Sequence, residues 1–319
     1  MENNLKSKNV LVTGGTGLVG SHLVEKLLGI GANVFILDIK VLPSSYFTSQ
    51  GLADKCTVLI QDIRDRGKMA EIVAQNNIDY IFHLAAQALV PEAFIDPYLT
   101  LDTNIMGTVS VLEAARLNKS IKGVVVASSD KAYGKDCVNV TEDKPLAGDH
   151  PYDVSKSATD LICTTYARTY NLPVAVSRFG NIFGPGDLNF NRIIPGIMDS
   201  LVNNRVLELR SNGRFLRDYV YVKDVADGYI TLAEQMEKSA GQAFNFSSGH
   251  NFSVLDLISN IEKVLEVKVL YKILNNQKNE IPAQSLNFEK VQKLLGWKPK
   301  YTFEQGIKET FEWYKEAKK

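Results

Sequence analysis

A tyrosine and a lysine stand four residues apart in the segment Tyr152-Asp153-Val154-Ser155-Lys156. Residues with this spacing lie on one face of a helix, so the phenol and the ammonium can act together. A phenol with its unperturbed pKa of about 10 is a poor base at neutral pH. A nearby positive charge favours the phenolate, which can then take the proton of an alcohol. The pair therefore predicts a general base at Tyr152, supported by Lys156.

A glycine-rich segment lies near the start of the chain, between a predicted strand and a predicted helix. It reads Thr13-Gly14-Gly15-Thr16-Gly17-Leu18-Val19-Gly20. In this context the pattern predicts a dinucleotide site, in which Gly14 allows the tight turn, Gly17 lets the backbone approach a pyrophosphate and Gly20 permits close helix–strand packing. The N-terminus of the helix offers free N–H groups and a partial positive charge to the phosphates.

The next predicted strand ends at an acidic residue, Asp38, which follows Gly20 by 18 residues. We expect its carboxylate to accept hydrogen bonds from the adenosine ribose and to repel a 2′-phosphate. The sequence therefore predicts NAD rather than NADP as the cofactor. A positively charged nicotinamide ring would add to the effect of Lys156 and further favour the phenolate of Tyr152.

The spacing of apolar residues predicts how these groups are positioned. The first half of the chain alternates short β-branched runs with longer amphipathic stretches, which is typical of parallel βαβ units. We predict an α/β fold, with a Rossmann-type doubly wound parallel sheet in residues 1–180 and a smaller, discontinuous α/β substrate-binding domain in residues 181–319. A segment near 219–237 is expected to return to the first domain. Strands are predicted at 9–13, 33–38, 57–61, 80–84, 123–127, 174–179 and 217–222, and helices at 18–30, 66–76, 101–117, 152–170, 193–203 and 225–235.

The spacing Gly-x-x-Gly-x-x-Gly of residues 14–20 resembles the extended short-chain dehydrogenase/reductase family, and matching segments run along nearly the whole chain. The resemblance implies that Ser129 orients the substrate oxygen, that Lys156 holds the nicotinamide ribose and that His83 has a structural place near the cofactor. Together with the glycine pattern it predicts the cofactor contacts, in which Asp62 and Ile63 hold the adenine: Gly14, Thr16, Gly17, Leu18, Val19, Gly20, Asp38, Ile39, Asp62, Ile63, Leu84, Ala85, Ala86, Gln87, Asn104, Tyr152 and Lys156.

Asp130 and Lys131 directly follow Ser129, and this triplet resembles the nucleotide-sugar 4,6-dehydratases, the CDP-glucose type in particular. The resemblance implies that Tyr152 takes the C4 hydroxyl proton as hydride passes to NAD. Asp130 then assists departure of the C6 hydroxyl as water, and the hydride returns to C6. Lys131 is either the base at C5, which requires a neutral amine, or a cation that stabilises the enolate. The sequence leaves both roles open.

The second half of the chain carries the features expected to hold a nucleotide-diphosphate sugar. By resemblance, Asn181 and Arg217 contact the diphosphate and Arg192 the nucleotide, while Gln87 and Ser129 face the sugar. The strand that begins at Arg217 is typical of the dTDP-glucose, GDP-mannose and epimerase types, so the nucleotide and the sugar stay open. A nucleotide-sugar 4-epimerase, decarboxylase or dehydrogenase, and an NAD-binding sensor without turnover, are the alternatives.

The composition of the chain limits the classes of binding partner that we expect. Lys plus Arg and Asp plus Glu both number 36, and this neutral balance argues against nucleic acids and membrane surfaces as partners. The longest apolar runs fall short of a membrane span, and the polar first residues predict no signal peptide. The two longest predicted helices are apolar on more than one face and predict a homodimer. The cysteines lack metal-type spacing, so we expect no metal and reduced thiols in the cytoplasm: Cys56, Cys137 and Cys163.

Overall fold

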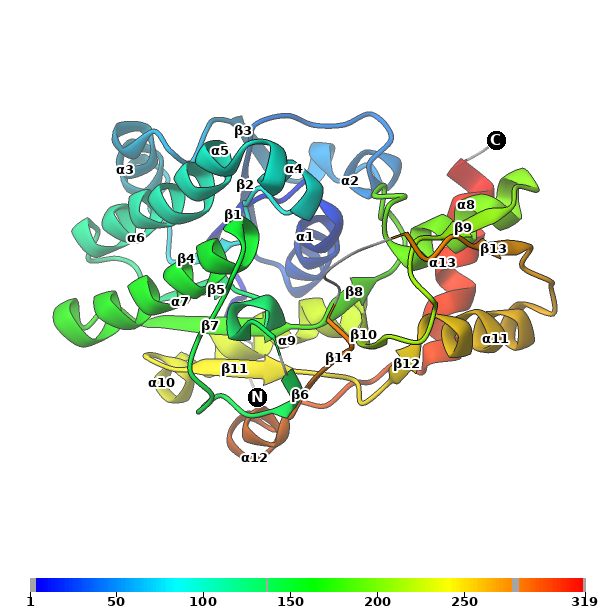
Figure 1. The fold of residues 1–319 in the computed structure, drawn as a ribbon. Helices are drawn as coiled ribbons and strands as arrows, with labels where there is room; N and C mark the ends of the chain where they lie inside the picture. Colours follow the sequence, from blue (N-terminus) through cyan, green and yellow to red (C-terminus); the bar gives the residue numbers. More distant parts are fainter. Residues whose placement is uncertain (1–3, 136, 277–280, 318–319) are drawn as a thin grey trace.

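The computed structural model describes residues 4–135, 137–276 and 281–317. Within these residues the central element is a seven-stranded parallel sheet in the order β3-β2-β1-β4-β5-β7-β11 (Figure 1). The direction of winding reverses between β1 and β4, which is the switch point of a doubly wound sheet. The predicted Rossmann-type fold is confirmed. The strands are β1 (Asn9–Thr13), β2 (Asn33–Asp38), β3 (Thr57–Ile60), β4 (Tyr80–His83), β5 (Gly123–Ala127), β7 (Val174–Phe179) and β11 (Ala243–Phe246).

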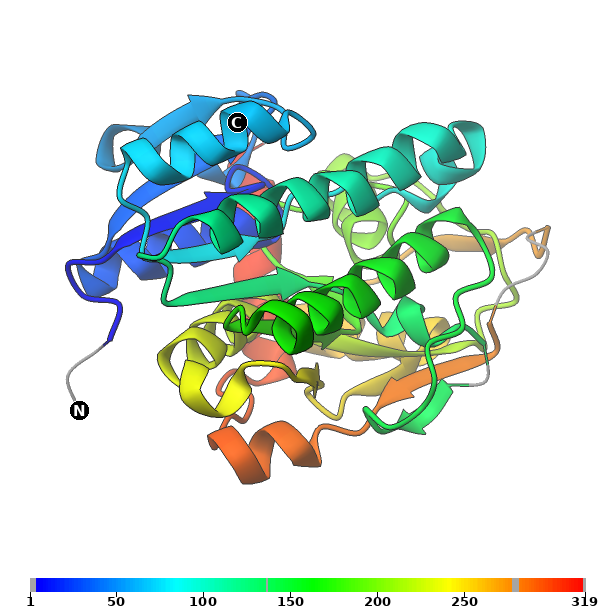
Figure 2. The ribbon, with the colours of Figure 1, turned by 90° about the vertical axis from the view of Figure 1, so that its left-hand side faces the viewer.

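Helices cover both faces of this sheet. Side chains alternate along each strand, so Leu11 of β1 packs beneath α3, α6 and α7, while Val10 and Val12 pack against the layer of α1 and α9. Burial on both faces explains why the strands read as almost continuous apolar runs. Figure 2 shows α6 and α7 crossing one face side by side. The helices are α1 (Leu18–Ile30), α3 (Arg66–Gln75), α6 (Gly107–Leu117), α7 (Pro151–Tyr170) and α9 (Val222–Glu234).

A second, smaller lobe is formed by β6 and by segments that follow β7. Its main sheet has the order β12-β10-β14-β6, with β8 paired to β10, and a two-stranded sheet joins β9 to β13. Three helices, α8, α11 and α13, pack with these strands around a separate apolar cluster. Its strands are β6 (Cys137–Val140), β8 (Asn181–Phe183), β9 (Leu207–Leu209), β10 (Leu216–Tyr221), β12 (Asn251–Ser253), β13 (Tyr271–Ile273) and β14 (Ala283–Leu286), and its helices α8 (Ile193–Asn203), α11 (Val254–Leu265) and α13 (Phe303–Ala317).

Within the predicted segment 219–237 the chain returns to the large lobe at α9, and it joins the large sheet again at β11. Strand β10, which contains Tyr219, lies in the second lobe, whereas α9 packs against α1 and β11 adds an edge strand beside β7. A four-residue edge strand carries too little alternation to be recognised in a sequence. No helix in the described parts of the chain is long and apolar enough to cross a membrane. The remaining short helices are α2 (Tyr46–Ser49), η1 (Ala53–Lys55), α4 (Val90–Ile95), α5 (Pro97–Leu101), the π-helical turn η2 (Asp102–Met106), η3 (Asp130–Tyr133), α10 (Met236–Ser239) and α12 (Glu289–Leu295).

Candidate active site

A cavity of about 1120 Å³ opens at the carboxyl ends of the parallel strands and extends to the second lobe. Pockets for one small molecule are typically about 300–1,000 Å³, so this cavity has room for a cofactor together with a substrate. It brings together every predicted site residue except Asn104. These are Gly14, Thr16, Gly17, Leu18, Val19, Gly20, Asp38, Ile39, Asp62, Ile63, Leu84, Ala85, Ala86, Gln87, Ser129, Asp130, Lys131, Tyr152, Lys156, Asn181, Arg192 and Arg217.

The glycine loop between β1 and α1 has the shape of a pyrophosphate cradle. Gly14 has a φ of +71°, and a Cβ there would lie 2.8 Å from the backbone nitrogen of Ala85. A Cβ on Gly20 would lie 2.1 Å from the carbonyl oxygen of Gly14. At Gly17, by contrast, the nearest atom would be 3.4 Å away, so packing within the protein does not require a glycine there. Since α1 has neither a side-chain cap nor an acidic residue in its first turn, its N–H groups remain available for an anion.

Asp38 is held at the rim of the cavity by three hydrogen bonds. Its Oδ2 accepts from the hydroxyl of Thr16 at 2.6 Å and from the backbone N–H of Thr16 at 3.2 Å, and its Oδ1 accepts from the N–H of Ile39 at 2.9 Å. Both oxygens keep lone pairs that can accept ribose hydroxyls. The carboxylate would also repel a 2′-phosphate. The cradle and this carboxylate together fit the diphosphate and the adenosine ribose of NAD.

His83 belongs to a buried hydrogen-bond chain in which each donor is determined. The Thr108 hydroxyl donates to the carbonyl of Asn104 at 2.6 Å, so it must accept from His83 Nε2 at 3.0 Å. His83 Nδ1 therefore accepts from the Thr13 hydroxyl at 2.8 Å, and that oxygen accepts from the N–H of Ala85 at 3.3 Å. Burial lowers the pKa of His83 to about 3. A neutral imidazole thus joins β1, β4 and α6, which is a structural role.

Asn104 does not reach the cavity, and its predicted contact with the cofactor needs correction. It is buried in the π-helical turn η2, where its Nδ2 donates to the carbonyl of Gln87 at 3.0 Å and to Ser155 Oγ at 2.9 Å. Its Oδ1 accepts from the N–H of Gln87 at 2.7 Å. Asn104 therefore positions Gln87, which lines the cavity. Gln87 Oε1 is buried and has no hydrogen-bond partner among the described residues, so it is available to a ligand.

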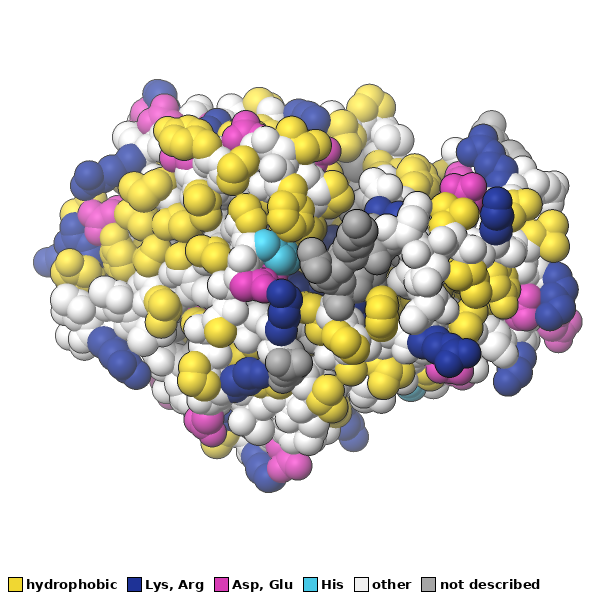
Figure 3. Space-filling model, in the orientation of Figure 1, with side chains coloured by type: hydrophobic (Ala, Val, Ile, Leu, Met, Phe, Trp, Pro, Cys, Tyr) yellow, Lys and Arg dark blue, Asp and Glu magenta, His cyan; other side chains and the backbone are white. Residues whose placement is uncertain are grey.

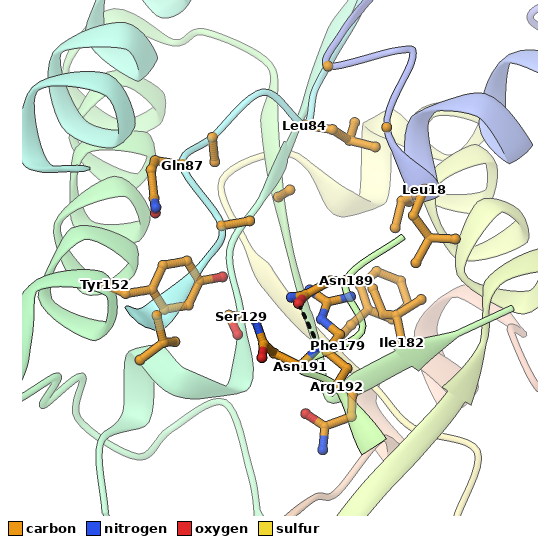
Figure 4. Close-up of a pocket in the computed structure, with 18 of the residues that line it drawn as sticks. Leu18, Leu84, Gln87, Ser129, Tyr152, Phe179, Ile182, Asn189, Asn191 and Arg192 are labelled. Carbon is orange, nitrogen blue, oxygen red and sulfur yellow. Dashed lines mark hydrogen bonds between the residues drawn. The ribbon is translucent and has the colours of Figure 1, made fainter. Parts of the chain in front are cut away.

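Tyr152 and Ser129 point into the cavity from the same side (Figure 4). Burial raises the pKa of Tyr152 to about 12, against the effects of the Arg192 cation and the neighbouring Ser129 hydroxyl. Lys156 is buried one turn along α7, where its Nζ lies 5.9 Å from the centre of the Tyr152 ring and donates to the carbonyl of Ala127 at 2.8 Å. Burial lowers the pKa of Lys156 to about 8. In the protein without ligands Tyr152 is therefore a neutral phenol, and it needs additional positive charge to become a base.

Asp130 and Lys131 form an ion pair at the cavity instead of a solvated turn. Ser129 caps the short helix η3, because its Oγ accepts from the N–H of Lys131 at 3.2 Å and donates to Asp130 Oδ1 at 2.9 Å. Lys131 Nζ lies 3.1 Å from Asp130 Oδ2 and 3.3 Å from Oδ1. Asp130 is only 4% exposed. The predicted hydroxyl, acid and cation thus form one hydrogen-bonded unit.

A buried hydrogen-bond network that we did not predict supports the unit of Ser129, Asp130 and Lys131. The Arg178 guanidinium donates to both carboxylate oxygens of Asp160, at 2.7 and 2.8 Å, and to the Tyr133 hydroxyl at 2.5 Å. That hydroxyl donates in turn to Asn245 Oδ1 at 2.8 Å. The network fastens η3 to α7, β7 and β11. Arg178 begins the Arg-x-x-Asn-x-aromatic-Gly-Pro segment that contains Asn181, but its partners lie far apart in the sequence, so the pattern did not reveal the network.

The second lobe supplies the opposite wall of the cavity. Figure 4 shows Asn189, Asn191 and Arg192 across from Tyr152. Arg192 begins α8 and donates to Asp187 Oδ2 at 3.3 Å. Asn181 lies on β8 and Arg217 on β10, and these strands pair in parallel. Sequence reasoning missed apolar residues of this wall, which include Leu207 and Leu209 of the short strand β9 and Phe215 just before β10.

Comparisons with known proteins agree with this arrangement. The family profile described as GDP-mannose 4,6 dehydratase matches residues 11–310. The chain is 31% identical to dTDP-glucose 4,6-dehydratase 1 of Escherichia coli, over 96% of this chain and 92% of that protein. It is also 31% identical to CDP-glucose 4,6-dehydratase of Salmonella typhimurium, over 98% and 92%. The crystal structure of dTDP-glucose 4,6-dehydratase from Bacillus anthracis, solved with NAD, is similar with a TM-score of 0.85 at 27% identity and covers 97% of both chains.

Proposed function

Because this chain belongs to the GDP-mannose 4,6-dehydratase family, within the extended short-chain dehydrogenases/reductases, we propose that it is an NAD-dependent nucleotide-sugar 4,6-dehydratase. One observation carries the proposal above all. The pair Tyr152 and Lys156 and the ion pair of Asp130 with Lys131 line the same cavity, beside a loop shaped for a dinucleotide. The first pair suits oxidation of a hydroxyl, and the second suits loss of water from the neighbouring carbons.

NAD bound at the glycine loop would accept the hydride from C4 of the sugar and return it to C6. The protein side chains handle the protons. Ser129 donates a hydrogen bond to the C4 oxygen, and Tyr152 as phenolate takes the C4 hydroxyl proton. The ammonium of Lys156 and the charge of the nicotinamide ring favour that phenolate, against the effect of burial. The product of this stage is a 4-keto sugar.

The ketone acidifies the proton at C5. Water is lost across C5 and C6 when a cavity base takes that proton and the C6 hydroxyl leaves with a proton from an acid, and the base gives its proton back to C5 as the hydride returns to C6. Asp130 faces the cavity and is assigned as the group that protonates the departing C6 hydroxyl. Asp130 is held in place by Lys131, whose Nζ lies 3.1 Å from its Oδ2. Arg217 is assigned to the diphosphate and Arg192 to the nucleotide, and both side chains line the cavity, which supports this assignment.

A panel of nucleotide sugars tests the proposal. The purified protein is incubated with CDP-glucose, dTDP-glucose, UDP-glucose and GDP-mannose, and the products are analysed by mass spectrometry. We expect one member to lose the mass of one water without net consumption of NAD. A product of unchanged mass would contradict the dehydratase and indicate a 4-epimerase. Accumulation of NADH would contradict it as well and indicate a dehydrogenase.

We propose in addition that two copies of the chain associate through α6 and α7, in the cytoplasm. Figure 3 shows hydrophobic side chains gathered over the region where these helices lie in Figure 1. The cytoplasmic location is supported by the cysteines, all of which are free thiols. Large apolar side chains exposed on this face, here called the helix face, support the dimer: Tyr98, Met106, Leu161 and Tyr170 are 51–78% exposed.

The dimer predicts a solution mass of twice the chain's 35.4 kDa. Leu161→Glu, which places a charge in the middle of the helix face, should convert the protein to a monomer, because a buried unpaired carboxylate is strongly unfavourable. Light scattering coupled to gel filtration measures both masses. Leu270→Glu is the matched control, since Leu270 is equally apolar and 65% exposed but lies in the second lobe. A monomeric wild-type protein, or a dimeric Leu161→Glu variant, would contradict the proposed interface.

A further inference from the structure

Gln284 is a buried amide on a strand that should carry an apolar residue at that position. In β14 the side chains alternate, and the inward positions are occupied by Gln284 and Leu286. Gln284 is only 1% exposed. Burial of an amide is unfavourable unless its polar atoms are hydrogen-bonded. Its hydrogen bonds therefore indicate why an amide stands there.

Both polar atoms of the Gln284 side chain bind the short helix η3, which carries Asp130 and Lys131. Gln284 Oε1 accepts a hydrogen bond from Lys131 Nζ, and Gln284 Nε2 donates to the backbone carbonyl of Asp130 at 3.2 Å. The orientation of the amide is determined, because a flipped amide would point its NH₂ group at an amine and its oxygen at a carbonyl. One side chain thus holds both members of the ion pair that lines the cavity.

The partners of Lys131 also indicate its protonation state. An amide oxygen can only accept a hydrogen bond, and so can an ionised carboxylate. Lys131 Nζ faces the Gln284 amide oxygen and both oxygens of Asp130, and at least one Asp130 oxygen stays an acceptor when the other carries the proton for the C6 hydroxyl. An ammonium has three donors and no acceptor, which matches this set, whereas a neutral amine that acts as a base needs a lone pair directed at its substrate.

Strand β14 makes this attachment rigid and connects it to the substrate wall. It lies between β10 and β6, with Gln284 in register with Arg217 on one side and with Cys137 on the other. The strand that carries Arg217 therefore sits next to the residue that holds Lys131. A nucleotide sugar bound against β10 would meet the ion pair in a defined position.

We propose that Gln284 is a positioning residue for the elimination step, which keeps Lys131 charged and fixed beside Asp130. Lys131 then stabilises the negative charge that develops when C5 loses its proton, and it is not the base at C5. This inference rests on the proposed dehydratase activity and settles the two roles that the sequence left open for Lys131.

A double-mutant cycle tests the connection between Gln284 and Lys131. The substrate is the member of the panel of CDP-glucose, dTDP-glucose, UDP-glucose and GDP-mannose that the wild-type protein dehydrates fastest. Gln284→Leu should lower kcat for dehydration by about tenfold or more and change KM by less than about threefold. In a Lys131→Met background, Gln284→Leu should lower kcat by less than about twofold, because Gln284 acts through Lys131. Equal losses in the two backgrounds would overturn the proposal.

Two further variants separate positioning from folding and from base catalysis. Ser285→Ala removes the neighbouring contact between β14 and β6, in which the Ser285 hydroxyl accepts from the N–H of Asn139 at 2.8 Å. Ser285→Ala should retain the wild-type kcat. A loss of kcat equal to that of Gln284→Leu would show that weaker pairing of β14 with β6 is enough to lower activity, which would contradict the proposal. Lys131→Arg retains a cation that cannot act as a base. It should keep far more activity than Lys131→Met, and equal inactivity of the two would contradict the role as a cation.

The outcome for the wild-type protein is independent of these comparisons. If the wild-type protein dehydrates no member of the panel, the proposed function fails. If it dehydrates one of them and Gln284→Leu matches its kcat, only the inference about Gln284 fails. Thermal unfolding and NAD titration of each variant verify that the protein remains folded and binds its cofactor.

Discussion

Tyr152→Phe should lower kcat by about 10²–10⁴-fold, the usual contribution of a general base, while leaving the affinity for NAD almost unchanged. The phenol carries the only proton acceptor assigned to the C4 hydroxyl, and phenylalanine keeps the ring without it. Lys156, which remains in place one turn along α7, keeps its hydrogen bond to the carbonyl of Ala127. Turnover of the preferred nucleotide sugar and calorimetric titration with NAD measure the two effects.

The matched control for this variant is Tyr166→Phe. Tyr166 lies on the same helix, but its hydroxyl donates to Glu113 at 2.9 Å, outside the cavity. Loss of that hydrogen bond should cost about 1 kcal/mol of stability and leave kcat intact. If Tyr152→Phe retained wild-type turnover, or if Tyr166→Phe lost as much, Tyr152 would not be the base.

The pH dependence of the wild-type enzyme follows from the same pair of side chains. Tyr152 must lose its proton to act, so kcat/KM should rise with pH on the acid side. Lys156 must keep its proton to favour the phenolate, and burial lowers its pKa to about 8. Once the charge of the bound nicotinamide ring brings the pKa of Tyr152 below that of Lys156, activity should fall again above about pH 8, which gives a bell-shaped profile. Tyr152→Phe should lose the acid limb along with the activity.

The fold could be predicted from the sequence wherever the signal was local. The inner strands of the large sheet, β1, β4, β5 and β7, are buried on both faces, so each reads as an apolar run between turns. Strand β11 at the sheet edge could not be found in this way, because its four residues follow α9 and α10 and pair with β7, more than 60 positions earlier. Pairing at such a distance leaves no mark within a local window.

In the candidate site, too, local patterns could be predicted from the sequence, whereas contacts between distant segments could not. The glycine loop, Asp38, and the pair Tyr152 and Lys156 are contiguous or regularly spaced, and the cavity collects them all. The sequence predicted a cofactor contact for Asn104, whereas its side chain binds the backbone of Gln87. The amino-acid pattern of a helix next to a binding segment is the same whether such a side chain contacts the ligand or the backbone. Gln284 could not be anticipated, because it meets Lys131 only through the pairing of β14 with β6 and β10.

Asp130→Asn should separate the two halves of the proposed reaction. The amide has the shape of the carboxyl group but cannot supply a proton, so elimination should slow by about 10²–10⁴-fold. Oxidation at C4 should continue, because Ser129, Tyr152 and Lys156 are unchanged. In a single turnover the absorbance of NADH should then rise and persist, whereas the wild-type enzyme should show at most a brief signal. Stopped-flow absorbance together with mass spectrometry of the sugar distinguishes the two stages.

Asp149→Asn is the matched control, because Asp149 lies near the same turn but pairs with Lys135 at 2.6 Å and does not line the cavity. It should behave like the wild-type protein. The variant Asp130→Asn also loses the charge that faces Lys131, so Lys131 is left with amide oxygens as acceptors, one of them that of Gln284. Combining Asp130→Asn with Gln284→Leu should therefore lower the rate of dehydration more than either change alone, because fewer acceptors then remain to hold Lys131 in position. An Asp130→Asn variant with wild-type dehydration would show that the proton for the departing hydroxyl comes from another group.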